Sequence, residues 1–68
     1  MQFRMFTDKV SGRKVAVNVE NVIEVDQNDD GSTTIWYDRF EGSVIKGQSI
    51  DVREDFDTVL SWLNTIAE

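Results

Sequence analysis

The chain has 68 residues, with 13 acidic and 7 basic side chains for a formal net charge of −6, and it contains no cysteine, histidine or proline. These counts exclude a disulfide scaffold, a thiol enzyme and a zinc finger, and they remove the side chain most often used for proton transfer near neutral pH. The composition, 40% hydrophobic and 29% charged, is typical of one globular domain over residues 1–68.

Residues 2–7 and 13–19 predict the two strands of a first hairpin. In the first strand Phe3 and Met5 share one side. In the second strand valine occupies every second position, which suits a pleated surface that is buried on one face. The turn formers of residues 8–12 lie between them and end in a glycine that adopts positive φ at little cost.

Residues 22–27 and 32–37 predict a second hairpin, with Ile23 on the inward face of its first strand. The Asp-Gly pair in the turn at residues 28–31 supplies the left-handed conformation that a tight hairpin needs. The oxygen-rich start of this turn also matches the beginning of a calcium loop. Because Tyr37 stands where such a loop needs a bidentate glutamate, we interpret the segment as a hairpin turn.

The C-terminal part of the chain predicts one further strand and a helix. Residues 38–43 show no regular pattern, and Gly47 interrupts residues 44–52, which indicates a bulged or split fifth strand. Asp55 is the expected N-cap of the helix. Apolar residues then recur at helical spacing, at Phe56, Val59, Leu60, Leu63, Ile66 and Ala67.

These elements together predict an α+β fold: a small antiparallel β-meander of four to five strands with one C-terminal α-helix packed on one face. The side chains that face the helix should form the core. The expected members are Phe3, Met5, Val15, Val17, Ile23, Val25, Ile35, Ile50, Val52, Phe56, Val59, Leu60 and Leu63.

Positive and negative charges occupy different parts of the chain. Residues 1–19 carry four basic side chains and one acidic, a sum of +3, and the remainder carries three basic and twelve acidic, a sum of −9. The acidic part either keeps a small domain in solution or imitates nucleic acid and docks on a basic protein surface. A net charge this negative disfavours direct binding to nucleic acid.

No group of residues in the sequence has the spacing of a catalytic, metal or cofactor site. The carboxylates do not converge, the four glycines are scattered, and no nucleophile stands beside a base, so we expect no catalytic residue, no metal site and no cofactor. The aromatic side chains are better candidates, because tryptophan and tyrosine are enriched at binding hot spots. Trp36 should lie on the sheet face away from the helix. The expected partner-binding residues are Phe6, Trp36, Tyr37, Arg39, Phe40 and Trp62, with a second small core under residues 38–49 as the alternative.

The order of these motifs resembles the small FlbD-like flagellar and swarming motility proteins. The residues that carry the resemblance are Phe3, Gly12, Val17-Asn18, Ile23-Glu24-Val25, Gly31 to Ile35, and Val52 to Glu54 leading to Val59. The resemblance implies a bacterial or phage accessory protein that acts by binding, and it transfers no catalytic residue. The 38–49 segment and the two tryptophans depart from the pattern of that family.

The sequence therefore predicts a non-enzymatic regulatory or protein-interaction module that acts as a homo-oligomer, because a core this small, without disulfides, often needs self-association. One alternative is an acidic inhibitor that blocks a basic surface of a host enzyme. Another is a small-ligand binder at a subunit interface, lined by Trp36, Tyr37 and Arg39. No stretch approaches the roughly 18 apolar residues of a membrane span, and no secretory signal is visible, so we expect no membrane partner and a cytoplasmic location.

Overall fold

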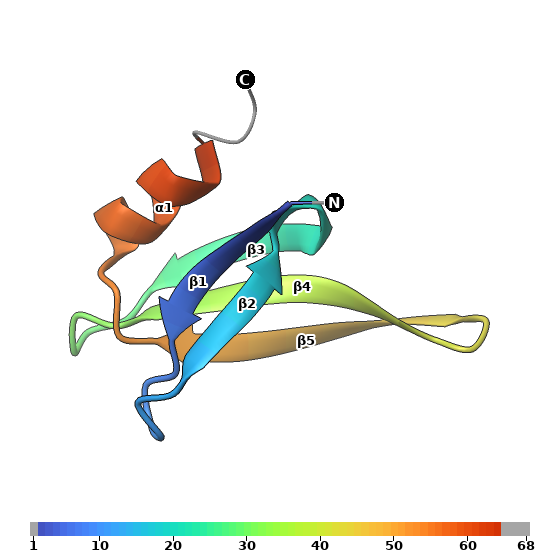
Figure 1. Cartoon of the computed structure of the whole chain (residues 1–68), viewed down its shortest axis with the longest axis horizontal. Coiled ribbons are helices and arrows are strands. Elements are labelled where there is room, and N and C mark those ends of the chain that lie inside the picture. The colour runs from blue at the N-terminus through green and yellow to red at the C-terminus, as the bar shows by residue number, and fades with distance from the viewer. Residues whose placement is uncertain (1, 65–68) are drawn as a thin grey trace.

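The computed structural model describes residues 2–64, apart from the side chains of residues 40, 41, 45 and 46 (Figure 1). It confirms the predicted small α+β fold with a C-terminal helix. The expected helix positions Ile66 and Ala67 lie outside the described residues. In chain order the elements are β1 (Phe3–Thr7), β2 (Lys14–Asn18), the short 3-10 helix η1 (Val19–Asn21), β3 (Val22–Gln27), β4 (Thr33–Glu41), β5 (Val44–Val52) and α1 (Phe56–Asn64).

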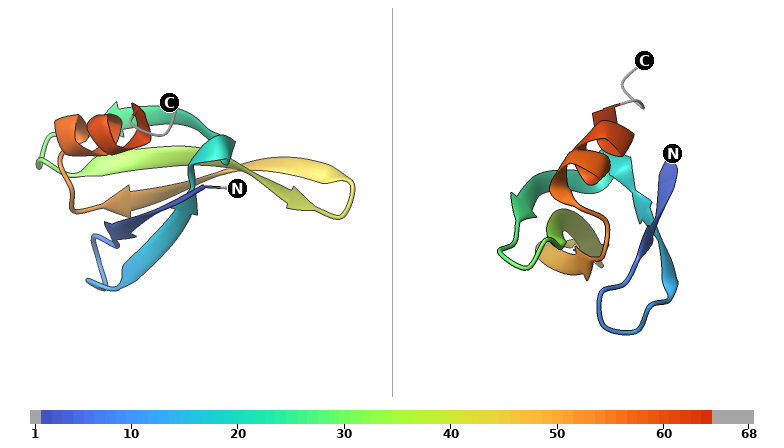
Figure 2. Two further views of the ribbon diagram at one scale, coloured as in Figure 1. Left: turned by 45° about the horizontal axis from the view of Figure 1, so that its top comes forward. Right: turned by 90° about the vertical axis from the view of Figure 1, so that its left-hand side faces the viewer.

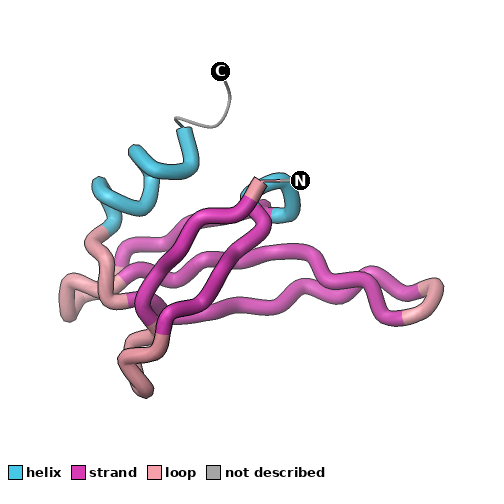
Figure 3. The backbone as a smooth tube through the Cα atoms, viewed as in Figure 1, coloured by secondary structure: helices cyan, strands magenta, loops and turns pink. Residues whose placement is uncertain are grey.

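The strands form two antiparallel sheets rather than one continuous meander: the β1–β2 hairpin, and a sheet in the order β3-β4-β5. The hairpin crosses one side of the larger sheet, and α1 lies beside β3 (Figure 2). The ribbon of β4 and β5 is the longest part of the molecule, and its turn projects beyond the other elements (Figure 3). The core lies between the sheets and the helix, where Phe6, Val17, Ile35, Val52 and Val59 are buried.

The prediction that Phe3 and Met5 of β1 face the core is wrong. Phe6 is fully buried, whereas Phe3 and Met5 are 51% and 53% exposed. The register explains the difference, because Phe6 lies opposite Val15 and therefore points to the same side as the inward valines of β2. Since both sides of β1 carry large apolar residues, its alternation alone does not tell which side faces the core.

A bulge changes the faces of β3. Its register with β4 shifts between Val22 and Glu24, and this shift separates Ile23 from Val25, which strict alternation would place on one face. Ile23 is consequently 60% exposed, whereas Val22 and Val25 pack against the core. The sequence places the irregularity at Gly47, but the pairing of β4 with β5 is continuous there. The expected bulged or split fifth strand is therefore wrong, and the 38–43 segment is strand up to Glu41.

Gly12 ends the turn of the first hairpin with φ of 74°, a left-handed conformation that favours glycine. Asp8 organises this turn. Its Oδ1 accepts the main-chain N–H groups of Val10 and Ser11, each at 2.9 Å, and its carbonyl accepts the N–H of Gly12 at 3.0 Å. The turn thereby brings the end of β1 against the end of β5.

A short junction joins the two sheets. The N–H of Arg53 donates to the carbonyl of Thr7 and the N–H of Lys9 donates to the carbonyl of Asp51, both at 2.9 Å. The Glu54 carboxylate accepts the main-chain N–H and the hydroxyl of Thr7, again at 2.9 Å each. These contacts fix the hairpin on the end of β5.

The helix begins where the sequence predicts. The carbonyl of Asp55 accepts the N–H of Val59 at 3.0 Å, and its carboxylate accepts the hydroxyl of Thr58 at 2.5 Å, as expected of an N-cap residue. Val59 is fully buried and Leu63 packs against the core. The expected core residue Leu60 is instead 38% exposed, because the helix covers only one end of the sheets and the outer edge of its apolar stripe stays in solvent.

Exchanging Phe6 for alanine tests the assignment of the faces of β1. We expect Phe6→Ala to lower the free energy of unfolding by about 3–5 kcal/mol, because it leaves a cavity in the core. The matched control Phe3→Ala, in the same strand, should cost less than about 1 kcal/mol. Urea unfolding monitored by circular dichroism measures both. Equal losses would show that Phe3 and not only Phe6 belongs to the core.

Removing the Glu54 carboxylate tests the junction. Glu54→Ala leaves the N–H and hydroxyl of Thr7 without their acceptor, so we expect a loss of about 1–3 kcal/mol. Glu24→Ala, which removes an exposed carboxylate from β3, serves as the control and should change stability by less than about 0.5 kcal/mol. Hydrogen exchange should also rise at Thr7 in the Glu54 variant. An unchanged exchange rate there would contradict the role given to this carboxylate.

Candidate interaction surfaces

The structure separates the predicted partner-binding residues into three places. Phe6 is fully buried in the core, so the expectation that Phe6 contacts a partner at the surface is wrong. Its ring centroid lies 5.5 Å from that of Trp62, which is 39% exposed at the edge of α1. Trp62 therefore covers part of the core and presents only one side to solvent. The side chain of Phe40 lies outside the described residues.

Trp36 lies on the side of the three-stranded sheet away from the helix, as predicted, and is 37% exposed. The register places it between Glu24 of β3 and Ser49 of β5. Its indole N–H donates to the carboxylate of Asp26 at 3.0 Å, which fixes the orientation of the ring. We call this surface, made of Glu24, Asp26, Trp36 and Asp51, the acidic face.

The carboxylates of the acidic face act on one another. Hydrogen bonding with Asp26, together with its negative charge, raises the pKa of Glu24 above its ordinary value, because ionising both groups brings like charges together. Asp51 accepts the hydroxyl of Thr34 at 2.7 Å, and Thr34 also contacts Asn28. The face therefore concentrates negative charge around Glu24 and Asp26, whereas the charge of Asp51 acts on Lys9 and helps raise the pKa of that lysine.

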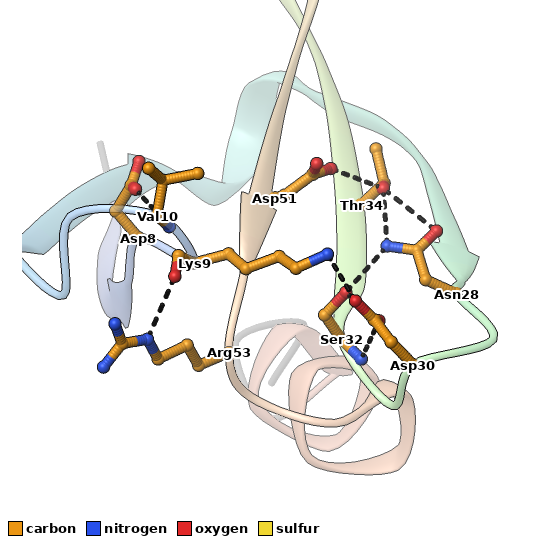
Figure 4. A network of polar contacts seen from close by, with 9 residues as sticks. All are labelled: Asp8, Lys9, Val10, Asn28, Asp30, Ser32, Thr34, Asp51 and Arg53. Atoms are coloured by element: carbon orange, nitrogen blue, oxygen red, sulfur yellow. Dashed lines mark hydrogen bonds and ion pairs between the residues drawn. The ribbon is translucent and has the colours of Figure 1, made fainter.

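A polar network borders the acidic face at the turn between β3 and β4 (Figure 4). Lys9, from the first hairpin, forms an ion pair with Asp30. The other oxygen of Asp30 accepts the N–H and the hydroxyl of Ser32 at 2.9 and 2.6 Å. The hydrogen bond from Lys9 and those from Ser32 hold the pKa of Asp30 well below its usual range, and the bond to Asp30 raises the pKa of Lys9.

Tyr37 and Arg39 lie on the other side of the sheet from Trp36, so the predicted ligand site lined by all three residues is not brought together. The Tyr37 hydroxyl and the Arg39 guanidinium both donate to Oε1 of Gln48, at 3.2 and 3.3 Å. They line a groove of about 420 Å³ between β2 and the β4–β5 ribbon. We call it the β2 groove; its lining residues are Phe3, Val15, Ala16, Val17, Asn18, Asn21, Tyr37, Asp38, Arg39 and Ile50.

Within residues 2–64, no group of three or more carboxylates is arranged to hold a metal ion. No helix in this part of the chain is long and apolar enough to cross a membrane. No family model, curated protein or solved structure matches the chain. The resemblance to the FlbD-like proteins therefore stays a prediction from the order of motifs.

Sequence reasoning missed the carboxylates around Trp36 and most of the β2 groove. The sequence contains the signal for the carboxylates of β3 beside Trp36. Residues directly opposite in a hairpin share a face, and the Asp-Gly turn sets that pairing for β3 and β4. The groove could not be predicted from the sequence, because it depends on how the first hairpin packs against the second sheet.

The pH dependence of stability tests the Lys9–Asp30 ion pair. The folded-state pKa of Asp30 is depressed, so the stabilisation is present above the unfolded value and is lost progressively as pH falls below about 4. We expect the urea midpoint of the wild type to exceed that of Asp30→Asn near neutral pH, and this difference to disappear in acid. Asp29→Asn, at the exposed neighbouring position, is the control. A difference independent of pH would mean that the charge of Asp30 is not what stabilises the turn.

Proposed function

We propose that this protein is a non-enzymatic regulatory module that binds a basic surface of another protein through its acidic face. The observation that supports the proposal is the exposed Trp36 ring, held by Asp26 and bordered by Glu24 and Asp51. An arginine or lysine side chain can lie against the face of an indole and pair with a carboxylate at the same time. In the acidic face, the indole ring of Trp36 and the carboxylates lie side by side.

The charge of this surface favours a basic partner over a second copy of the chain. A symmetric dimer through the acidic face would bring the same carboxylates of both copies together, and like charges at such short range cost free energy. Within one copy, the neighbouring Asp26 already raises the pKa of Glu24. A basic protein surface removes this repulsion, as the predicted acidic inhibitor would on a host enzyme.

Titration with a hexa-arginine peptide tests the proposal, with the indole N–H of Trp36 observed by NMR. We expect this signal to shift, and the affinity to fall steeply as salt is raised. Trp36→Ala should weaken binding by roughly 30-fold, the effect of about 2 kcal/mol at a hot spot. Affinity should also fall in acid, as Glu24 takes up a proton.

Three further measurements decide between the predicted functions. Phe3→Ala removes an exposed ring from a different surface and should leave peptide binding unchanged. The charge-neutral variant Glu24→Gln/Asp26→Asn/Asp51→Asn should abolish binding, whereas Asp29→Asn should not. Light scattering at high concentration should find a monomer. A dimer that Trp36→Ala dissociates would contradict the basic partner and support the predicted self-association.

A further inference from the structure

The β2 groove runs beside a strand that has only one neighbour. In residues 2–64, β2 pairs with β1 and with no other strand. Hydrogen bonds at the two ends of the hairpin show which residues of β2 face β1: the carbonyl of Arg13 accepts the N–H of Asp8 at 2.8 Å, and the N–H of Val19 donates to Gln2 at 3.0 Å. The other edge of β2 is open to the groove.

The alternation of an antiparallel ladder identifies the groups on the open edge. Because Arg13 and Val19 direct their main-chain groups towards β1, so do the residues between them at odd-numbered positions. Lys14, Ala16 and Asn18 must then direct their N–H and C=O groups the opposite way. Ala16 and Asn18 line the groove. The groove therefore has a wall of regularly spaced main-chain donors and acceptors, which is what an added strand needs.

The side chains of the groove suit an apolar occupant. Val17 is buried at its base, and Val15 and Ile50 are partly buried beside it. Phe3, on the opposite face of the hairpin, reaches the rim. In a strand added to β2, every second side chain points to the same side as the valines of β2 and would contact Ile50 and Tyr37.

Positive charge sets the chemistry of the occupant. Arg39 donates one hydrogen bond to Gln48, and its guanidinium has further N–H groups that can bind a ligand in the groove. Lys14 stands on β2 itself, and the first 19 residues carry a net charge of +3 in a chain of −6. Asp38 is the acidic lining residue, and it lies next to Arg39 on β4. The Lys14 ammonium donates to the hydroxyl of Thr7 at 3.2 Å, and Lys14 does not line the groove, so a carboxylate in the occupant would be placed best against Arg39.

We propose that the free edge of β2 binds an extended peptide of a partner protein as an added strand, with apolar side chains at alternate positions and a carboxylate that contacts Arg39. This surface is separate from the acidic face, and it lies on the hairpin whose residues 1–19 carry a net charge of +3. A second copy paired along β2 is disfavoured, because it would bring two basic hairpins together. The occupant is thus a different, acidic chain.

An eight-residue peptide that alternates valine and threonine, with one central glutamate, is the probe. On addition of the peptide, we expect hydrogen exchange to slow at the amides of Lys14, Ala16 and Asn18, and to change little at Val15 and Val17, which already face β1. The same peptide with alternate N-methyl groups keeps its side chains but lacks the donors on one edge, and should not bind. Equal binding of the N-methylated peptide, or unchanged exchange at Ala16 and Asn18 at millimolar peptide, would overturn the proposal.

Two pairs of variants distinguish binding by strand addition from non-specific binding of the peptide. Ala16→Pro removes an N–H from the open edge, a position where edge strands tolerate proline, and should weaken binding at least tenfold. Ala16→Thr keeps the N–H and should bind normally. Arg39→Gln should weaken the glutamate peptide roughly tenfold without affecting a glutamine version, and Arg13→Gln should affect neither. If light scattering shows dimers in which the Ala16 and Asn18 amides are protected without peptide, a second copy occupies the edge and the proposal fails.

Discussion

The junction between the end of β1 and residues 51–54 is the constraint on which the arrangement of the molecule depends. The two sheets share no strand, and their main-chain contact is the short set of hydrogen bonds around Thr7 and Val52. Glu54 strengthens it from the side. Burial alone would raise the pKa of this carboxyl, but the hydrogen bonds from Thr7 and the charge of Lys14 outweigh burial and lower it. The carboxylate thus remains charged where two sheets and a helix meet, and Thr33 donates to its main-chain carbonyl from β4 at 2.8 Å.

The position of this junction explains why the molecule is closed at one end and open at the other. In residues 2–64, the isolated bridge between the hairpin and β5 joins Asp8 to Val52. The helix and the Phe6–Trp62 contact fill the space on one side. On the other side β2 and the β4–β5 ribbon stay apart, and the β2 groove is the space between them. The groove is therefore the gap left between β2 and the ribbon, bordered at one end by η1, which joins β2 to β3.

Local signals in the sequence were sufficient for the elements but not for their faces. The Asp-Gly turn, the alternating valines of β2 and the apolar stripe of α1 each identify an element by its own period. The inward side of β1 depends instead on its register with β2, and that of β3 on a bulge for which no glycine gives a signal. Trp36 was placed correctly because it alternates with Ile35, a fully buried neighbour in the same strand. Tyr37 and Arg39 were expected to share a site with Trp36, but alternation itself puts them on the other side of the sheet.

The positive and negative charges that occupy different parts of the chain also lie on different surfaces of the folded protein. The basic hairpin contributes Lys9 to the turn beside the acidic face, where it neutralises Asp30, and leaves Arg13 and Lys14 beside the open edge of β2. An open edge is a hazard, because its main-chain groups can pair with another copy, and proteins commonly protect such edges with lysine and with short strands. β2 has both features, since it spans only Lys14–Asn18. A short edge bordered by positive charge resists pairing with its own copies. In the proposal made for β2, the residues that limit aggregation are also those that would favour a chain of opposite charge.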